Sequence, residues 1–366
     1  MIGFSERPWL VAVLLMVLIV QGMDVALGSQ QVPAMFVFGD SIVDVGNNNY
    51  LNSYAKCNYP PYGIDYPTGP SCRFSNGKNF VDLLGDLLGL PSPPAYANPS
   101  TIGARILGGV NYASAAGGIL DESGRHYGER YSLSQQVLNF ENTLNQLRTM
   151  LSGTALSQYL ARSITVMVIG SNDYINNYLM PSLYPSSYIY NPQDYGNLLL
   201  NRYTRQILAL NSLGLRKFFL AGIAPLGCIP NQRASGRSPP DQCVNSVNQM
   251  LGTFNEGLRS LVQQLNSNHP GSIFSYGNIY GALGDMLNNP AAYGFGVVDR
   301  ACCGIGRNQG EVTCTPFLTP CADRSQYVFW DAYHLTQAAS SVLAQRAFSG
   351  PQSDCYPINI QQIAQL

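Results

Sequence analysis

The stretch "FVFGDSIVDVGNNNYL", residues 36–51, changes character in its middle. It begins as an apolar run of strand composition that ends at Gly39-Asp40-Ser41, and it continues into asparagines that a buried strand would not carry. The pattern predicts a buried strand that places Ser41 where the chain turns polar. Such a serine is either a turn former or a nucleophile, and a nucleophile needs a base, an orienting acid and donors for developing negative charge.

The first 28 residues have the pattern of a secretory signal peptide. Arg7 precedes an apolar run from Trp9 to Val20, and the small residues Ala26 and Gly28 follow at the positions that cleavage requires. A membrane anchor is the alternative, but the run is short for a bilayer span. We therefore expect cleavage after Gly28, and one extracellular, monomeric domain over residues 29–366.

The composition excludes some classes of partner. Charged residues make up 11% of the chain and the net charge is −1, whereas an average soluble domain has roughly 25% charged residues. A nucleic-acid-binding protein would carry a basic stripe, which is missing here. Polarity comes instead from uncharged side chains and 23 tyrosines. We expect an uncharged or weakly polar substrate, no cofactor and no metal.

The nine cysteines suit an oxidising compartment. Two pairs are each 15 residues apart, four further cysteines cluster, and Cys355 stands alone. We expect four local disulfides and a free Cys355. A zinc site is the alternative for the cluster, but its spacing is not a C-x-x-C repeat. The two pairs are Cys57 with Cys72 and Cys228 with Cys243, and the cluster is Cys302, Cys303, Cys314 and Cys321.

Apolar runs of strand length alternate with segments of helical period along the rest of the chain. This alternation predicts a parallel sheet covered by helices, with ligands bound at the carboxyl ends of the strands. Two loop-rich stretches, 52–78 and 299–326, read as insertions stapled by disulfides. The expected strands lie within 34–39, 163–170, 216–227, 272–280 and 327–331, and the expected helices within 131–151, 193–214, 241–271 and 335–348.

The chain has three histidines, and one of them stands out as a base. In "FWDAYHLTQAA" Asp331 precedes His334 by three residues, so both can share one face of a turn and the carboxylate can orient the imidazole. Asp331 as a simple helix cap is the alternative. His126 reads as a surface residue in a charged loop, and His269 as a residue at a helix C-terminus.

Two further segments end at the same predicted edge of the sheet. "VIGSNDY" (168–174) places Asn172 just past a buried run, where its side-chain amide can donate to an oxyanion. "GGVNYASAAGGILDESG" (108–124) carries Gly117 and Gly118, which allow the backbone to approach a ligand closely. Each segment alone also fits an ordinary turn. Together with Ser41, Asp331 and His334 they complete the set needed for acyl transfer.

At these residues the sequence resembles plant members of the GDSL lipase/esterase family, within the SGNH-hydrolase superfamily. The resemblance rests on "FGDSIVDVGNNN", "NYASAAGGI", "IGSNDY" and "DAYHLTQAA" in this order, and it covers essentially the whole chain after the leader. It implies a flavodoxin-like three-layer α/β/α fold with a mainly parallel sheet. It also implies Ser41 as nucleophile, Asp331 as orienting acid and His334 as base.

The resemblance further implies an oxyanion hole built from the Ser41 N–H, the Asn172 amide and a glycine N–H. We assign the glycine as Gly118, with Gly117 as second choice. The expected activity is hydrolysis of a small-molecule, lipid or polymer ester through an acyl-enzyme on Ser41. Transfer of the acyl group to an alcohol and a catalytically silent binding protein remain as alternatives. No G-x-S-x-G or H-E-x-x-H motif supports an α/β-hydrolase or a metal hydrolase.

Overall fold

A five-stranded sheet in the order β1-β2-β3-β4-β7 forms the centre of the molecule in the computed structural model, which describes residues 31–239 and 242–366. The signal peptide predicted for residues 1–28 lies outside this range. The first four strands run parallel, and β7 is antiparallel to β4. The strands are β1 (Met35–Gly39), β2 (Ile164–Val168), β3 (Lys217–Ala221), β4 (Ile273–Gly277) and β7 (Cys355–Tyr356).

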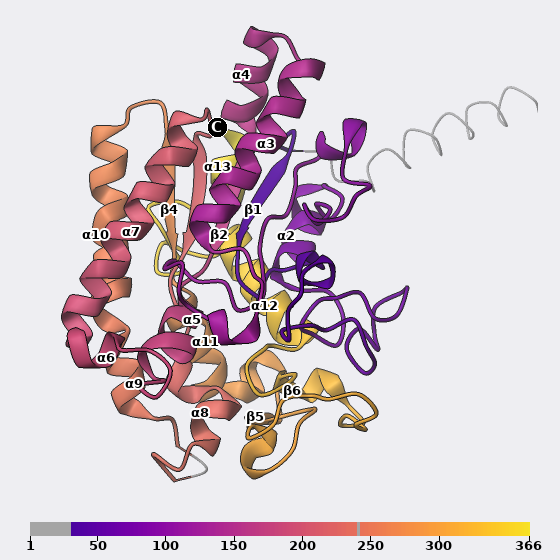
Figure 1. Cartoon of the computed structure of the whole chain (residues 1–366), viewed down its shortest axis with the longest axis vertical. Coiled ribbons are helices and arrows are strands. Elements are labelled where there is room, and N and C mark those ends of the chain that lie inside the picture. Colours follow the sequence, from indigo (N-terminus) through magenta and orange to yellow (C-terminus); the bar gives the residue numbers. More distant parts are fainter. Residues whose placement is uncertain (1–30, 240–241) are drawn as a thin grey trace, which may run out of the picture.

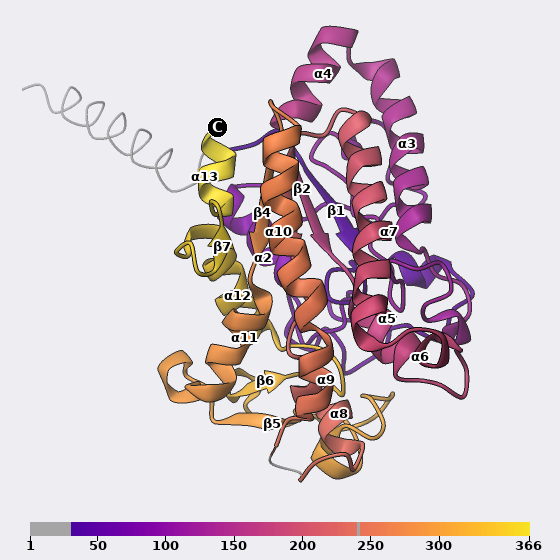
Figure 2. The same cartoon turned by 90° about the vertical axis from the view of Figure 1, so that its left-hand side faces the viewer.

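Helices cover both faces of this sheet, which gives the three-layer α/β/α arrangement (Figures 1 and 2). Helices α3, α7 and α10 lie side by side over one face, and α2, α11, α12 and α13 lie on the other. The helix bounds are α2 (Phe80–Leu88), α3 (Leu133–Met150), α4 (Gly153–Arg162), α5 (Ser171–Asp173), α6 (Ser186–Ile189), α7 (Pro192–Ser212), α8 (Pro230–Ala234), α9 (Asn245–Met250), α10 (Gly252–Asn268), α11 (Ile279–Asn288), α12 (Gln337–Ser349) and α13 (Ile360–Gln365).

The continuous apolar run of β1 follows from burial on both faces. Successive side chains of a strand point to opposite sides. Phe36 and Phe38 therefore join the apolar cluster beneath α3, α7 and α10, whereas Met35 and Val37 join the cluster beneath α2 and α12. A strand buried on both faces carries no polar alternation, which is why residues 34–39 read as a strand without a period-two pattern.

Three elements differ from the sequence expectation. The predicted strand at 327–331 forms as β6 (Tyr327–Phe329), but it pairs with β5 (Val297–Ala301) in a separate two-stranded sheet. The predicted helix at 241–271 is divided into α9 and α10 around Gly252, a poor helix former. The fifth strand of the central sheet, β7, is only two residues long and escapes any periodicity argument.

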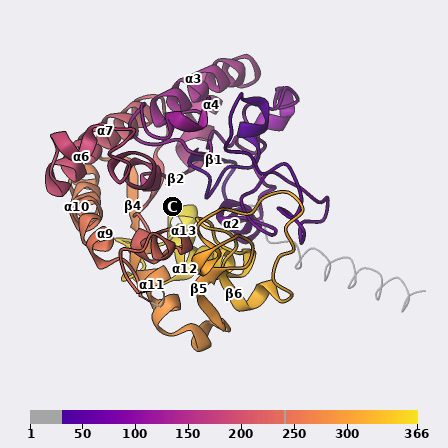
Figure 3. The ribbon, with the colours of Figure 1, turned by 60° about the horizontal axis from the view of Figure 1, so that its bottom comes forward.

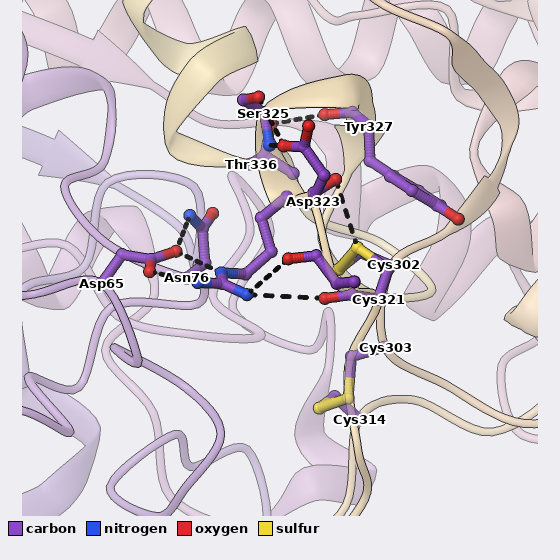
Figure 4. The surroundings of a disulfide bond; sticks show 12 residues. Asp65, Asn76, Cys302, Cys303, Cys314, Cys321, Asp323, Ser325, Tyr327 and Thr336 are labelled. Carbon is purple, nitrogen blue, oxygen red and sulfur yellow. Dashed lines mark hydrogen bonds and ion pairs between the residues drawn. A yellow bond between two sulfur atoms is a disulfide. The ribbon is translucent and has the colours of Figure 1, made fainter.

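Within the described ranges, three disulfides form instead of the four expected. Cys228 pairs with Cys243 as predicted. The four-cysteine cluster forms two bridges, Cys302–Cys321 and Cys303–Cys314, and so provides no zinc site (Figure 4). The expected bridge between Cys57 and Cys72 is wrong, because both thiols are free, and Cys355 is free as predicted.

An ion pair joins the two loop-rich insertions. Arg324 in the disulfide-bridged segment contacts Asp65 at 2.5 Å, and Asn76 donates to the same carboxylate at 2.8 Å (Figure 4). The segments 52–78 and 299–326 are therefore in contact although they are far apart in sequence. None of the helices in the described part of the chain has both the length and the apolar character to cross a membrane.

Candidate active site

Ser41 lies in the first turn after β1. The strand pairing continues one residue past Gly39, because the Asp40 N–H donates to the Val168 carbonyl at 3.1 Å. The Asp40 carboxylate then turns the chain by accepting the Ile42 N–H at 3.0 Å. Ser41 is held between these two contacts at the carboxyl end of the sheet, where parallel α/β folds bind their ligands.

The asparagines that follow Ser41 tie a second segment to this edge. Asn47 Nδ2 donates to the carbonyls of Asn111 and Ala113 at 2.9 and 2.7 Å. Asn48 Nδ2 donates to the Ala115 carbonyl at 3.0 Å. Both asparagines are buried, and their amides satisfy buried backbone carbonyls, of which that of Asn111 also accepts the Tyr96 N–H. The "NNN" run thus holds residues 111–115 beside the nucleophile turn.

His334 and Asp331 reach Ser41 from the turn after β6. The His334 Nε2 lies 2.8 Å from Ser41 Oγ, and its Nδ1 lies 2.8 and 2.9 Å from the two Asp331 carboxylate oxygens. The Trp330 N–H donates to the His334 carbonyl at 2.8 Å and closes this turn. Base and acid therefore come from the small β5–β6 sheet, whereas Ser41 comes from the central sheet. Figure 3 shows α11, β5 and β6 gathered at this end of the molecule.

Asp331 is fully buried and accepts hydrogen bonds from several donors. The backbone N–H groups of Tyr333 and His334 each donate to its Oδ1 at 2.8 Å, and the Tyr62 hydroxyl donates to Oδ2 at 2.5 Å. Burial alone raises the pKa of this carboxyl, but the charge of His334 and the hydrogen bonds from His334 and Tyr62 outweigh burial and lower the pKa. Asp331 is therefore an anion that can orient and stabilise an imidazolium.

Asn172 follows β2 on the short helix α5. Its Nδ2 donates to the Gly117 carbonyl at 2.9 Å, and its Oδ1 accepts from Asn176 Nδ2 at 2.6 Å. These two contacts fix which end of the amide is nitrogen, and leave its second N–H for another acceptor. Asn176 lies in a π-helical turn (Tyr174–Tyr178) with φ −117° and ψ 22°, a distortion that is frequent at functional sites.

Ser41, Asn172 and His334 line the same two adjoining cavities, but neither predicted glycine lines either one. The Gly117 N–H donates to the Ser114 carbonyl at 3.0 Å. Gly118 lets the chain pass close to a neighbouring helix, since a Cβ there would lie 2.7 Å from an Asp173 carboxylate oxygen. From this segment Ala115 and Ala116 line the second cavity, and Ala116 adopts the left-handed region at φ 64°.

Three buried carboxylates, those of Asp40, Asp44 and Asp173, lie near this site but are not part of the Ser41–His334–Asp331 contacts. Burial raises the pKa of Asp40 to about 7 and that of Asp44 and Asp173 to about 6. Asp173 accepts the backbone N–H groups of Ile119 and Leu120 at 2.8 and 2.9 Å. Asp173 therefore fixes the segment after Gly118, while its neighbour Asn172 faces the cavities.

The other two histidines line neither cavity. His126 Nδ1 lies 2.7 Å from the Tyr184 hydroxyl, and His269 ends helix α10. Tyr62 was not predicted, because nothing distinguishes it among 23 tyrosines. Asn176 was also missed, although its position four residues after Asn172 is the spacing at which helical side chains meet.

A serine bonded to a histidine that an aspartate orients is the arrangement of serine hydrolases. The profile of the GDSL-like lipase/acylhydrolase family matches residues 35–347. The chain is 63% identical over 357 residues to GDSL esterase/lipase At1g71250 of Arabidopsis thaliana, covering 98% of this chain and 96% of that protein. It is 52% identical over 363 residues to GDSL esterase/lipase At5g08460 of the same plant, covering 98% and 94%.

The protein belongs to the GDSL lipase/acylhydrolase family, as the sequence resemblance predicted. Its fold is the three-layer α/β/α fold expected for that family, and it is a carboxylic ester hydrolase.

Proposed function

We propose that the protein hydrolyses esters through an acyl-enzyme on Ser41, with His334 as general base and Asp331 as its orienting acid. The observation that carries this proposal is the unbroken chain of contacts from Ser41 Oγ to His334 Nε2 at 2.8 Å and from His334 Nδ1 to Asp331 at 2.8 Å. These are the distances at which a proton passes from nucleophile to base.

In the first step Ser41 Oγ attacks the ester carbonyl carbon and its proton moves to His334 Nε2. The carbonyl oxygen becomes an oxyanion, which the Ser41 N–H and the free N–H of Asn172 stabilise. The tetrahedral intermediate collapses, the bond to the alcohol oxygen breaks, and His334 gives its proton to that oxygen. Water then attacks the acyl-enzyme with His334 again acting as base, and the acid leaves.

For the third oxyanion donor we propose a different residue from the one that the resemblance implies. Gly118 remains the donor implied by the resemblance, but Gly118 lines neither cavity, which favours Ala116. Among the described residues neither the Ala116 N–H nor the Gly118 N–H donates a hydrogen bond, but only Ala116 of the two lines a cavity that Ser41 also lines. We therefore place Ala116 in this role ahead of Gly118 and Gly117.

We also propose that residues 1–28 direct secretion and that residues 29–366 act as one extracellular domain. The disulfides among the described residues support an oxidising compartment. Acyl transfer to an alcohol shares every step up to the acyl-enzyme. Chromatographic analysis of products formed with an alcohol such as glycerol in excess would separate glycerol ester from free acid.

A fluorophosphonate probe followed by peptide mass mapping tests the nucleophile. We expect an adduct on Ser41 in the folded protein, lost in Ser41→Ala and His334→Ala and retained in Ser157→Ala, which changes an exposed serine of α4. An adduct on Ser171, another serine that lines the first cavity, would contradict the assignment. So would labelling that survives His334→Ala at the wild-type rate.

A further inference from the structure

Two cavities meet at the proposed nucleophile and differ in chemistry. The first encloses about 850 Å³ and the second about 580 Å³, both including space open to solvent. The residues shared by both are Ser41, Asn172, Ile175, Tyr333 and His334. An ester whose carbonyl carbon lies at Ser41 can therefore extend one part into each cavity.

The first cavity is apolar. It reaches from the carboxyl ends of β2 and β3 to α11 and α12, and its walls are largely aliphatic. Apart from Asp40, Tyr333 and His334, its lining in the described part of the chain carries no ionisable side chain. Ala224 and Ile279 line it and remain only partly buried by the protein itself. Covering accessible apolar surface in a cavity with an alkyl chain is favourable in free energy.

The second cavity is more polar than the first and is rich in aromatic side chains. The loop-rich segment 52–78 contributes Lys56 and Tyr59 to its walls, and the segment 299–326 contributes Thr313. Tyr54, which also lines it, is 88% exposed, so this side opens to solvent. Hydroxyl, ammonium and ring groups of this kind suit an alcohol that carries hydroxyl groups or a ring.

The two-step chemistry decides which half of the ester occupies which cavity. The acyl group becomes bonded to Ser41 in the first step and remains there until water releases it in the second, so it benefits from enclosure. The alcohol must leave after the first step, and water must enter in its place, which requires a wet and open side. We propose that the first cavity binds an aliphatic acyl chain of medium or long length and that the second binds a polar or aromatic alcohol. This inference rests on the proposed acyl-enzyme mechanism.

The dependence of kcat/KM on acyl-chain length, compared between the wild type and variants in which an alanine is enlarged to leucine, tests the assignment. For 4-nitrophenyl esters from acetate to dodecanoate, we expect kcat/KM of the wild type to rise by about fourfold for each early methylene. Ala224→Leu, which narrows the first cavity, should flatten this rise. Ala161→Leu, a partly buried alanine on α4, should keep the wild-type profile. Ile279→Phe serves as a second narrowing variant if Ala224→Leu unfolds at a lower temperature.

Ala55→Leu in the second cavity provides the crossed comparison. It should keep the chain-length profile and change the ratio of 4-nitrophenyl octanoate to methyl octanoate turnover, because it alters the alcohol side. If Ala55→Leu flattens the chain-length profile and Ala224→Leu does not, the two halves are assigned the wrong way round. A wild-type enzyme that hydrolyses acetate as well as dodecanoate also overturns the proposal.

Binding separates this inference from the mechanism on which it rests. Ser41→Ala should bind dodecanoate in calorimetry, and adding Ala224→Leu should weaken that binding at least tenfold. Absence of dodecanoate binding, in a protein whose wild type shows Ser41-dependent turnover, overturns the acyl cavity and leaves the mechanism intact. Dodecanoate binding without Ser41-dependent turnover of any ester overturns the mechanism and leaves the cavity as a site for an alkyl chain.

Discussion

Asn176 should act on catalysis only through Asn172. Asn176→Ala removes the N–H that donates to Asn172 Oδ1 at 2.6 Å and leaves that oxygen buried without a donor. A hydrogen bond between uncharged groups contributes about 0.5–1.5 kcal/mol, which corresponds to about twofold to twelvefold in rate. Asn172→Ala removes an oxyanion donor itself and should cost roughly 100- to 1,000-fold in kcat.

The assay is steady-state hydrolysis of a 4-nitrophenyl ester, with kcat and KM determined separately. Both variants should lower kcat and leave KM nearly unchanged, because the oxyanion is absent from the bound substrate and forms only on the way to the tetrahedral intermediate. Asn176→Asp keeps the shape of the side chain but places an acceptor against Asn172 Oδ1, so it should cost more than Asn176→Ala. Asn142→Ala, at an exposed asparagine of α3, is the matched control and should behave as the wild type.

The double variant decides whether the reasoning holds. If Asn176 acts by orienting the amide, Asn172→Ala/Asn176→Ala should be no slower than Asn172→Ala, since residues that act as one unit are not additive. If Asn176→Ala lowers kcat in the Asn172→Ala background by the same factor as in the wild type, Asn176 acts independently of Asn172. The refuting results are therefore additivity in the double variant or an effect confined to KM.

Three further predictions concern stability. Tyr62→Phe removes a hydrogen bond to the Asp331 carboxylate and should lower the free energy of unfolding at pH 7 by about 1.5–3 kcal/mol in urea titrations. Because the pKa of Asp331 is lowered, this difference between variant and wild type should shrink as the pH falls below about 4. A difference independent of pH would contradict the prediction. Asp40, whose pKa is raised to about 7, binds its proton more tightly in the folded than in the unfolded protein, so its contribution to stability is lost as the pH rises from about 4 to 7. Asp40→Asn should make this decline in stability with pH less steep. An unchanged dependence of the unfolding temperature on pH would count against the prediction. Replacing Cys228 and Cys243 by alanine opens a loop of 15 residues and should cost about 3 kcal/mol in guanidinium unfolding, whereas a loss below about 1 kcal/mol would show that the loop is already constrained.

The sequence predicted most of the layer architecture because the strands of the central sheet are buried on both faces and so appear as uninterrupted apolar runs. It predicted Ser41 and Asp331 because each lies two residues past a strand, and His334 because it lies three residues after Asp331. It could not show that β6 leaves the central sheet, since an apolar run of three residues carries no information about its pairing partner.

Contacts made by irregular segments were out of reach for a different reason. Tyr62 reaches Asp331 across 269 positions of sequence from a loop with no period. The two thiols Cys57 and Cys72 have the same spacing as the bonded pair Cys228 and Cys243, yet they stay free. Spacing alone cannot report whether the backbone brings two sulfur atoms together.

Because Asp331 and His334 follow a strand of the separate β5–β6 sheet, catalysis depends on the local structure of that sheet as well as on the global fold. The Cys302 and Cys303 N–H groups donate to the carbonyls of Phe329 and Trp330 at 3.0 and 2.7 Å, directly before Asp331. Both cysteines are bridged within the same segment, so reduction of these bridges loosens the element that carries acid and base, whereas no described disulfide joins the strands of the central sheet. Local opening there requires less free energy than global unfolding. Turnover should therefore disappear at reductant concentrations that leave the circular dichroism of the helices intact.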